Sequence, residues 1–320
     1  MNIAFLVYDS RSGSTLLSRE VANAFENVFV TPEIGFDSLL ASGKKSLKQK
    51  EWALILKEMY RGHEFINFDI PYEDALQIVC SDNQPLDVTG GIKALIKEYT
   101  HRQNRDGVQW VIVKNGSHLQ YWKEIKKIFG HETVFFNIIR DPRAVINSKL
   151  KTRRPYHNEV MAWGGVIPAV VRWKLYARAI QNAKQEGVKI YQLKFEELIA
   201  DVGCAIDKIS VFLDVSSEKS KWKYQIPDNE QQIHDLVLSD DIVDNRVEAW
   251  MTELPINDRY LIEALCEKEM NVLGYKKTIH LSLIKKIVLS VSEIPGMTKK
   301  ILNHFLLKLR ESLLTQKNSS

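Results

Sequence analysis

Four short, unbroken apolar runs constrain the fold of this chain more than any other feature of its sequence. They are rich in β-branched and aromatic side chains and cover residues Ile3–Tyr8, Trp110–Val113, Thr133–Ile139 and Lys189–Leu193. Continuous rather than alternating apolar residues are typical of strands that are covered on both faces, as in a parallel sheet. The runs therefore predict four buried, parallel strands.

Helical patterns lie between and beside these runs. Apolar residues at helical spacing predict helices over Ser14–Phe25, Ile92–His101, Leu119–Phe129, Pro142–Lys151 and Val170–Lys184. Strands that alternate with helices indicate an α/β fold, a doubly wound and mainly parallel sheet flanked by helices as in the P-loop nucleotide-binding proteins. A chain of 320 residues with 45% hydrophobic content is large enough to bury such a core.

Positive charge is concentrated at the C-terminal end of the chain. The formal net charge is +4, but residues 281–320 hold seven Lys and Arg against two Glu, which leaves −1 for residues 1–280. A nearly neutral body does not suggest a nucleic-acid-binding protein. We expect one domain over residues 1–276 and a basic, amphipathic, helical tail over residues 277–320.

The tail pattern fits two arrangements. Its apolar stripe suits packing on the body or on a second copy of the chain, and its lysine-rich face suits a peripheral contact with a membrane. No run reaches the roughly 20 apolar residues that span a bilayer, and the N-terminus has no secretory signal. Three scattered cysteines, without metal-ligand spacing, fit a reducing compartment. We expect a cytoplasmic protein without a metal site, at most peripheral to a membrane.

The segment between the first strand and the first helix reads Asp9-Ser-Arg-Ser-Gly-Ser-Thr15. Helix N-terminal N–H groups and the helix dipole favour bound anions, and Ser14 and Thr15 add hydroxyl donors. The lysine that follows glycine in GxxxxGK[ST] is missing, and Arg11 stands before the glycine instead. The loop suits a donor with one 5′-phosphate and a terminal anionic group, bound without magnesium. Taken alone, it also fits an ordinary capped turn.

A second group of polar residues follows the third buried run. Arg140 stands at the end of that strand, Pro142 lies in the first turn of the next helix, and Ser148 lies two turns further on. At the carboxyl edge of a parallel sheet, such residues converge on a bound ligand. The sequence therefore predicts a second anion-binding element there.

Strand–RSGST–helix followed by strand–RDPRAVxxS–helix resembles the sulfotransferases that use 3′-phosphoadenosine 5′-phosphosulfate (PAPS), in particular their carbohydrate and bacterial branches. The resemblance implies transfer of a sulfuryl group from PAPS to an acceptor hydroxyl, which releases adenosine 3′,5′-bisphosphate. It implies that the phosphosulfate is held by Arg11, Ser12, Gly13, Ser14 and Thr15. It assigns the 3′-phosphate to Arg140 and Ser148, joined by Arg246 from a closing Arg-Val-Glu-Ala-Trp segment.

The proton of the acceptor needs a base, and Glu33, His118 and Lys114 compete for that role. Glu33 lies in a Pro-Glu element that resembles one facing the acceptor in some bacterial sulfotransferases. His118 lies four residues after Lys114, whereas cytosolic sulfotransferases place a catalytic histidine two residues after the corresponding lysine. Lys114 fits a contact with the sulfonate better than the role of a base, and Arg11 is expected to neutralise the bridging oxygen. Glu33 is favoured as the base because it is close to the loop of residues 9–15, the donor loop, which is expected to bind the phosphosulfate.

The acceptor is the least determined part of the prediction. Residues 151–168 mix Arg, His, Trp and paired Gly, which suits a sugar or an anionic acceptor and equally suits a lid. We expect a carbohydrate, a glycolipid or another small metabolite. Two other classes of protein remain open as alternatives. One is a P-loop phosphotransferase that uses ATP and magnesium, against which the missing lysine argues. The other is a non-catalytic protein that binds a polyanion or a membrane, against which the two intact anion-binding elements argue.

Overall fold

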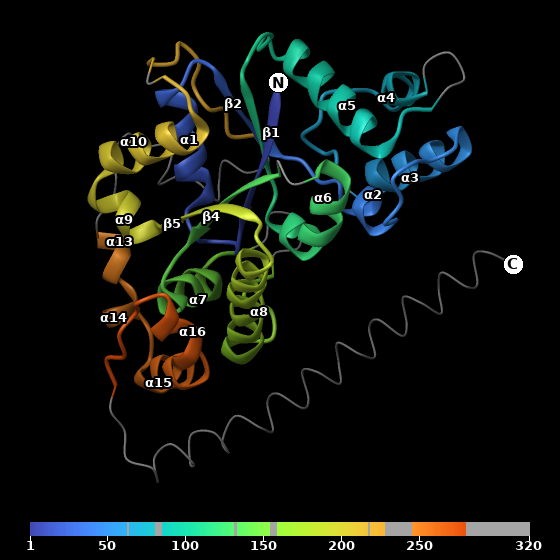
Figure 1. The fold of residues 1–320 in the computed structure, drawn as a ribbon. Coiled ribbons are helices and arrows are strands. Elements are labelled where there is room, and N and C mark those ends of the chain that lie inside the picture. The colour runs from blue at the N-terminus through green and yellow to red at the C-terminus, as the bar shows by residue number, and fades with distance from the viewer. Residues whose placement is uncertain are drawn as a thin grey trace, which may run out of the picture. The chain divides into compact units, whose positions relative to one another are not determined.

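A five-stranded sheet with parallel pairings organises the chain (Figure 1). The computed structural model describes residues 1–62, 64–80, 85–130, 133–153, 159–216, 218–227 and 245–279. The strand order is β2-β3-β1-β4-β5. The strands are β1 (Asn2–Tyr8), β2 (Val28–Glu33), β3 (Trp110–Lys114), β4 (Val134–Ile139) and β5 (Lys189–Lys194). The predicted α/β fold and the four predicted strands are confirmed, and β2 adds the edge beside β3. β1, β3 and β4 are buried as predicted, but β5 is the other edge strand and only its Leu193 is buried.

The predicted helices are also present. They are α1 (Ser14–Ala24), α5 (Val88–Arg102), α6 (Trp122–Phe129), α7 (Pro142–Lys151) and α8 (Val166–Gln185), with a 3₁₀ turn, η2 (Gly116–Tyr121), ahead of α6. Between β2 and α5 lie α2 (Asp37–Ala41), α3 (Gln49–Arg61) and α4 (Tyr72–Val79). After β5 come α9 (Phe195–Ala200), α10 (Val202–Leu213), α13 (Asn245–Glu248), α14 (Trp250–Glu253), α15 (Ile256–Leu265) and α16 (Glu267–Val272).

Both faces of the central strands β1, β3 and β4 are buried, which explains why these strands are almost continuously apolar. Phe5 and Val7 of β1 belong to a core cluster with residues of α3, α4 and α5. Leu6, between them, lines a small apolar cavity with Leu17 and Val21 of α1. Because neighbouring strand residues point to opposite faces, α1 covers one face and α3–α5 cover the other.

The chain divides into two compact units. The first contains residues 1–140 and 176–244, and the second contains residues 141–175 and 245–320. The sheet and the loop after β1 belong to the first unit. The predicted tail lies outside the described residues from position 280 onward, so its helices stay a prediction, as does a domain boundary at residue 276. Among the described helices, none combines the length and the apolar character needed to cross a membrane.

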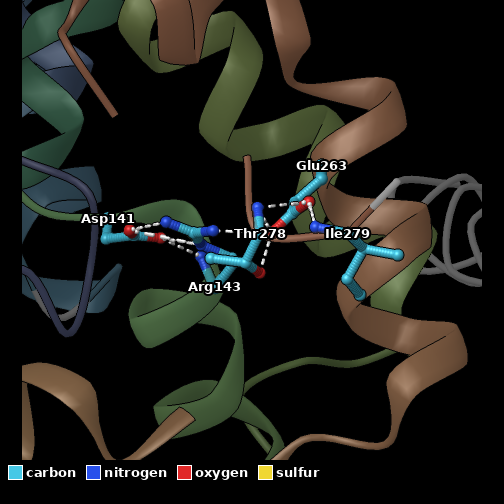
Figure 2. Close-up of polar contacts among 5 residues, drawn as sticks. All are labelled: Asp141, Arg143, Glu263, Thr278 and Ile279. Carbon is cyan, nitrogen blue, oxygen red and sulfur yellow. Dashed lines mark hydrogen bonds and ion pairs between the residues drawn. The ribbon is translucent and has the colours of Figure 1, made fainter. Parts of the chain in front are cut away.

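A buried cluster of charges lies inside the second unit (Figure 2). Asp141 caps the N-terminus of α7 by accepting from the backbone N–H of Arg143, 2.8 Å. The Arg143 guanidinium donates to Asp141 and to Glu263 of α15, with closest distances of 2.6 Å to each. Thr278 donates its backbone N–H and its hydroxyl to Glu263. These bonds lower the pKa of Glu263, although its burial acts in the opposite direction. Two residues of the second motif therefore serve the structure of this unit.

Candidate active site

The loop between β1 and α1 has a conformation that requires glycine. Gly13 has φ of 92°, and a Cβ there would lie 2.3 Å from the ring of Phe195 in α9. Arg11 also has a positive φ, 71°, and the backbone N–H of Ser12 donates to the Asp9 carbonyl at 3.2 Å. No side chain caps α1, and the buried Ser12 Oγ has no hydrogen-bond partner among the described residues. The loop therefore presents a helix N-terminus and a buried hydroxyl at the end of β1.

Arg140 brings a cation to the same loop. Its side chain is almost fully buried, and its Nη1 donates to the carbonyl of Arg11 at 3.3 Å. Its guanidinium carbon lies 4.2 Å from the ring centre of Phe195. The strands β1 and β4 are adjacent, but the chain runs from β1 to β2 at one edge of the sheet and from β4 to β5 at the other edge. Ligands of open α/β sheets bind at such a switch point.

Lys114, the last residue of β3, links the first turn of α1 to Glu33. Its side chain is fully buried, and burial of an ammonium group requires polar partners. Nζ donates to Thr15 Oγ1 at 3.2 Å and to the hydroxyl of Tyr224 at 3.4 Å. It also lies 3.9 Å from Glu33 Oε1. Two predicted site residues, Thr15 and Glu33, thus contact a third, the buried cation of Lys114.

A bulge in β2 decides which way Glu33 points. Between Val30 and Glu33 the strand advances three residues while β3 advances two. Pro32 has no N–H to donate to a neighbouring strand, and Thr31 Oγ1 accepts from the backbone N–H of Lys114 at 3.1 Å. Without the extra residue, Glu33 would pass to the opposite face of the sheet. With it, Glu33 is paired with Lys114.

Two tyrosines complete this cluster, and the sequence analysis did not identify either. The Tyr8 hydroxyl donates to Glu33 Oε1, and the Tyr8 ring centre lies 5.9 Å from Lys114 Nζ. Tyr8 ends an apolar strand and so resembles an ordinary core residue. Its position just before the loop of residues 9–15 could have indicated a place in the site. Tyr224 belongs to no motif and is more than 100 residues from Lys114 in the sequence.

His118 lies on the other face of the sheet. Its ring packs against Phe5 and Phe36, with ring centres 5.6 and 6.0 Å apart, and its Nε2 accepts from the backbone N–H of Phe36 at 3.1 Å. Complete burial lowers the pKa of His118 to about 3. Lys114 pairs with Leu6 and contacts Thr15, so the Glu33 cluster lies on the α1 face. The geometry therefore favours Glu33 over His118 as the base.

Ser148 and Arg246 belong to the second unit. Ser148 lies in α7, where its carbonyl accepts the backbone N–H of Thr152. Arg246 lies in α13 with its side chain half exposed, and its Nη1 is 3.8 Å from Glu253 Oε1. The assignment of both residues to the 3′-phosphate stays a prediction. Of the loop predicted to face the acceptor, residues 154–158 lie outside the described part of the chain.

The protein has an α/β fold of the P-loop-like class, and its candidate anion-binding loop lacks the P-loop lysine. The sequence pattern of the Sulfotransferase family matches residues 5–219. This span covers both the RSGST loop and the RDPR motif, and it is more than half of the chain. The protein therefore belongs to the sulfotransferase family and is an enzyme of that family. No curated protein matches the chain.

Solved structures agree with this fold. The sulfotransferase domain from the Synechococcus PCC 7002 olefin synthase is 17% identical, with a TM-score of 0.57, over 86% of this chain and 95% of its own. The sulfotransferase domain from the curacin biosynthetic pathway is 16% identical, with a TM-score of 0.53, over 87% of this chain and 99% of its own. The predicted membership of the sulfotransferase family is confirmed.

Proposed function

We propose that this enzyme transfers the sulfuryl group of PAPS to the hydroxyl of a carbohydrate, a glycolipid or another small metabolite. The observation that supports the proposal most directly is the hydrogen bond between Arg140 and the Arg11 carbonyl. It joins the two anion-binding motifs at the switch point of the sheet. The buried Ser12 hydroxyl and the uncapped N-terminus of α1 are donors that a phosphosulfate can use.

The residues around Lys114 divide the chemistry between them. PAPS supplies an activated sulfuryl group, whose bond to the phosphate oxygen breaks as the acceptor oxygen bonds to sulfur. Arg11 is assigned to the charge that develops on the departing oxygen, because a guanidinium stays protonated and can contact two oxygens. Lys114 fits a contact with the sulfonate, since it already joins Thr15 to Glu33. Glu33 takes the proton of the acceptor hydroxyl.

A direct test combines donor binding with product identification. Adenosine 3′,5′-bisphosphate should raise the melting temperature of the protein, and ATP with magnesium should not. Incubation with ³⁵S-labelled PAPS and fractions of a cell extract should then label a sugar, lipid or small-metabolite fraction. Stabilisation by ATP with magnesium alone would support a phosphotransferase instead. Binding of the bisphosphate without labelled product in any fraction would support a non-catalytic protein.

Replacing Arg140 with Ala should weaken binding of adenosine 3′,5′-bisphosphate by about 10- to 150-fold. The variant loses a charge-assisted contact to a phosphate, worth about 1.5–3 kcal/mol. Calorimetric titration measures the effect, and a melting curve without ligand checks the fold, because Arg140 also stacks on Phe195. Arg102→Ala is the matched control, because that guanidinium pairs with Asp74 and Glu98 at the end of α5. Unchanged affinity in a folded Arg140 variant would contradict the assignment of Arg140.

Chelation of metal ions should leave turnover almost unchanged. The proposed donor site depends on backbone N–H groups, hydroxyls and arginines, which are donors to anions rather than ligands of a cation. Rates with and without EDTA, after dialysis against metal-free buffer, give the comparison. A loss of activity that magnesium restores would argue against the proposed site and in favour of phosphoryl transfer.

A further inference from the structure

Tyr8 holds one oxygen of the Glu33 carboxylate. The phenol lies at the end of β1, directly before the donor loop, and it is almost fully buried. The Glu33 side chain, by contrast, is 44% exposed. The Tyr8 hydroxyl donates to Oε1 of Glu33, and the Lys114 Nζ lies 3.9 Å from the same oxygen. A buried, rigid group thus contacts a half-exposed, flexible one.

Both contacts use the same carboxylate oxygen. In the described part of the chain, neither a hydrogen bond nor an ion pair engages Oε2 of Glu33. A glutamate side chain that is half exposed would otherwise sample several rotamers. Fixing Oε1 between a phenol and an ammonium restricts these rotamers and leaves Oε2 available for a proton. A base acts efficiently only when such geometry is held.

The sheet register explains why this contact forms. Lys114 pairs with Leu6 on one side and with Glu33 on the other. Tyr8 is two residues beyond Leu6, so its side chain leaves β1 on the same face as that of Leu6. The phenol therefore reaches across the end of β3 to the carboxylate on β2. No loop has to close to make the contact, because three paired strands supply all of its parts.

We infer that Tyr8 is a positioning residue for the base: its hydroxyl fixes Oε1 of Glu33 so that Oε2 faces the acceptor hydroxyl. The inference rests on the proposed function and deepens it. Tyr8 does not itself take the proton of the acceptor. Its contribution acts through Glu33 and disappears when Glu33 cannot serve as a base.

A double-mutant cycle isolates that dependence. Tyr8→Phe keeps the ring and its packing and removes only the hydroxyl. In the wild-type background it should lower kcat by about 10-fold or more, the loss of one hydrogen bond to a charged group. In the Glu33→Gln background the same change should cost less than about 2-fold, because the two residues act as one unit. The readout is release of adenosine 3′,5′-bisphosphate from PAPS in the presence of the acceptor fraction.

Tyr60→Phe is the matched control. The hydroxyl of Tyr60 donates to the carbonyl of Ile70 at 2.5 Å, and its ring packs against Phe65 and Tyr72. Tyr60→Phe also removes one phenolic hydrogen bond, here to a neutral backbone carbonyl, and its kcat should stay at the wild-type value. Affinity for adenosine 3′,5′-bisphosphate should be unchanged in Tyr8→Phe, which separates an effect on the base from an effect on the donor loop.

The outcomes distinguish this inference from the proposed function. If wild-type protein neither binds the bisphosphate nor turns over PAPS, the proposed function fails and the role of Tyr8 fails with it. If the wild type is active, a normal kcat in Tyr8→Phe overturns the inference alone. Equal losses in both backgrounds, or a loss of donor affinity, also overturn it, because the phenol would then act on the loop rather than through Glu33.

Discussion

Glu33→Gln should lower kcat by at least about 100-fold while donor affinity stays near that of the wild type. A positioned base contributes about 10²–10⁴ in rate. Glutamine keeps the size of the side chain and retains an oxygen that can accept from Tyr8, so the geometry is preserved and only the basicity is lost. The proposed donor site does not include this carboxylate, and calorimetry with adenosine 3′,5′-bisphosphate should therefore give an unchanged Kd.

A second carboxylate and the rival histidine provide the comparisons for this variant. Glu64→Gln is a matched control, because this nearby half-buried carboxylate accepts from Ser38 instead. A near-normal kcat in Glu33→Gln, together with a folded but inactive His118→Ala, would transfer the role of base to His118.

Arg143→Ala should lower the free energy of unfolding of the second unit by about 3–5 kcal/mol. The substitution removes the shared partner of Asp141 and Glu263, so two buried carboxylates lose the same cation. It also removes a guanidinium whose carbon lies 3.8 Å from the ring centre of the buried Trp250. Urea unfolding monitored by tryptophan fluorescence and by circular dichroism measures the change.

This loss of stability should depend on pH in a defined direction. Burial raises the pKa of Glu263, but hydrogen bonds from Thr278, Ile279 and Arg143 lower it by more, and the variant loses the Arg143 contribution. A carboxylate with a lowered folded pKa contributes stability above its unfolded value, near 4.5, and loses it as the pH falls through the folded value. The difference between wild type and Arg143→Ala should therefore narrow below about pH 4.5.

An exposed ion pair of the same unit provides the control. Lys151 pairs with Glu253 at 2.8 Å, but its side chain is 50% exposed. Lys151→Ala should therefore cost no more than about 1 kcal/mol. If Arg143→Ala were equally mild, the buried cluster would contribute little net stability, and its role would have to be sought in orientation of the helices instead.

Local patterns in the sequence were sufficient to predict the fold and to single out the loop between β1 and α1. Strands covered on both faces leave continuous apolar runs, and a helix that begins with Pro142 or follows Gly13 leaves a recognisable junction. Because the residues from Asp9 to Thr15 are adjacent in the chain, their meeting needs no knowledge of distant contacts. The loop and the strand-end Arg140 are therefore recognisable from the sequence as candidates for binding an anion.

The sequence alone ranked Glu33 first among the candidate bases, but the groups around Glu33 depended on tertiary structure. Whether Glu33 faces Lys114 is decided by one extra residue in β2, and an edge strand reveals its register only when it pairs with a neighbour 80 residues away. Spacing alone could not place His118, because it lies beyond the end of β3 in the 3₁₀ turn η2, where the alternation of strand side chains no longer applies. Tyr8 and Tyr224 reach Lys114 from segments that are distant in the sequence. Composition and periodicity determine which residues are buried, but contacts between distant segments exist only once the sheet has formed.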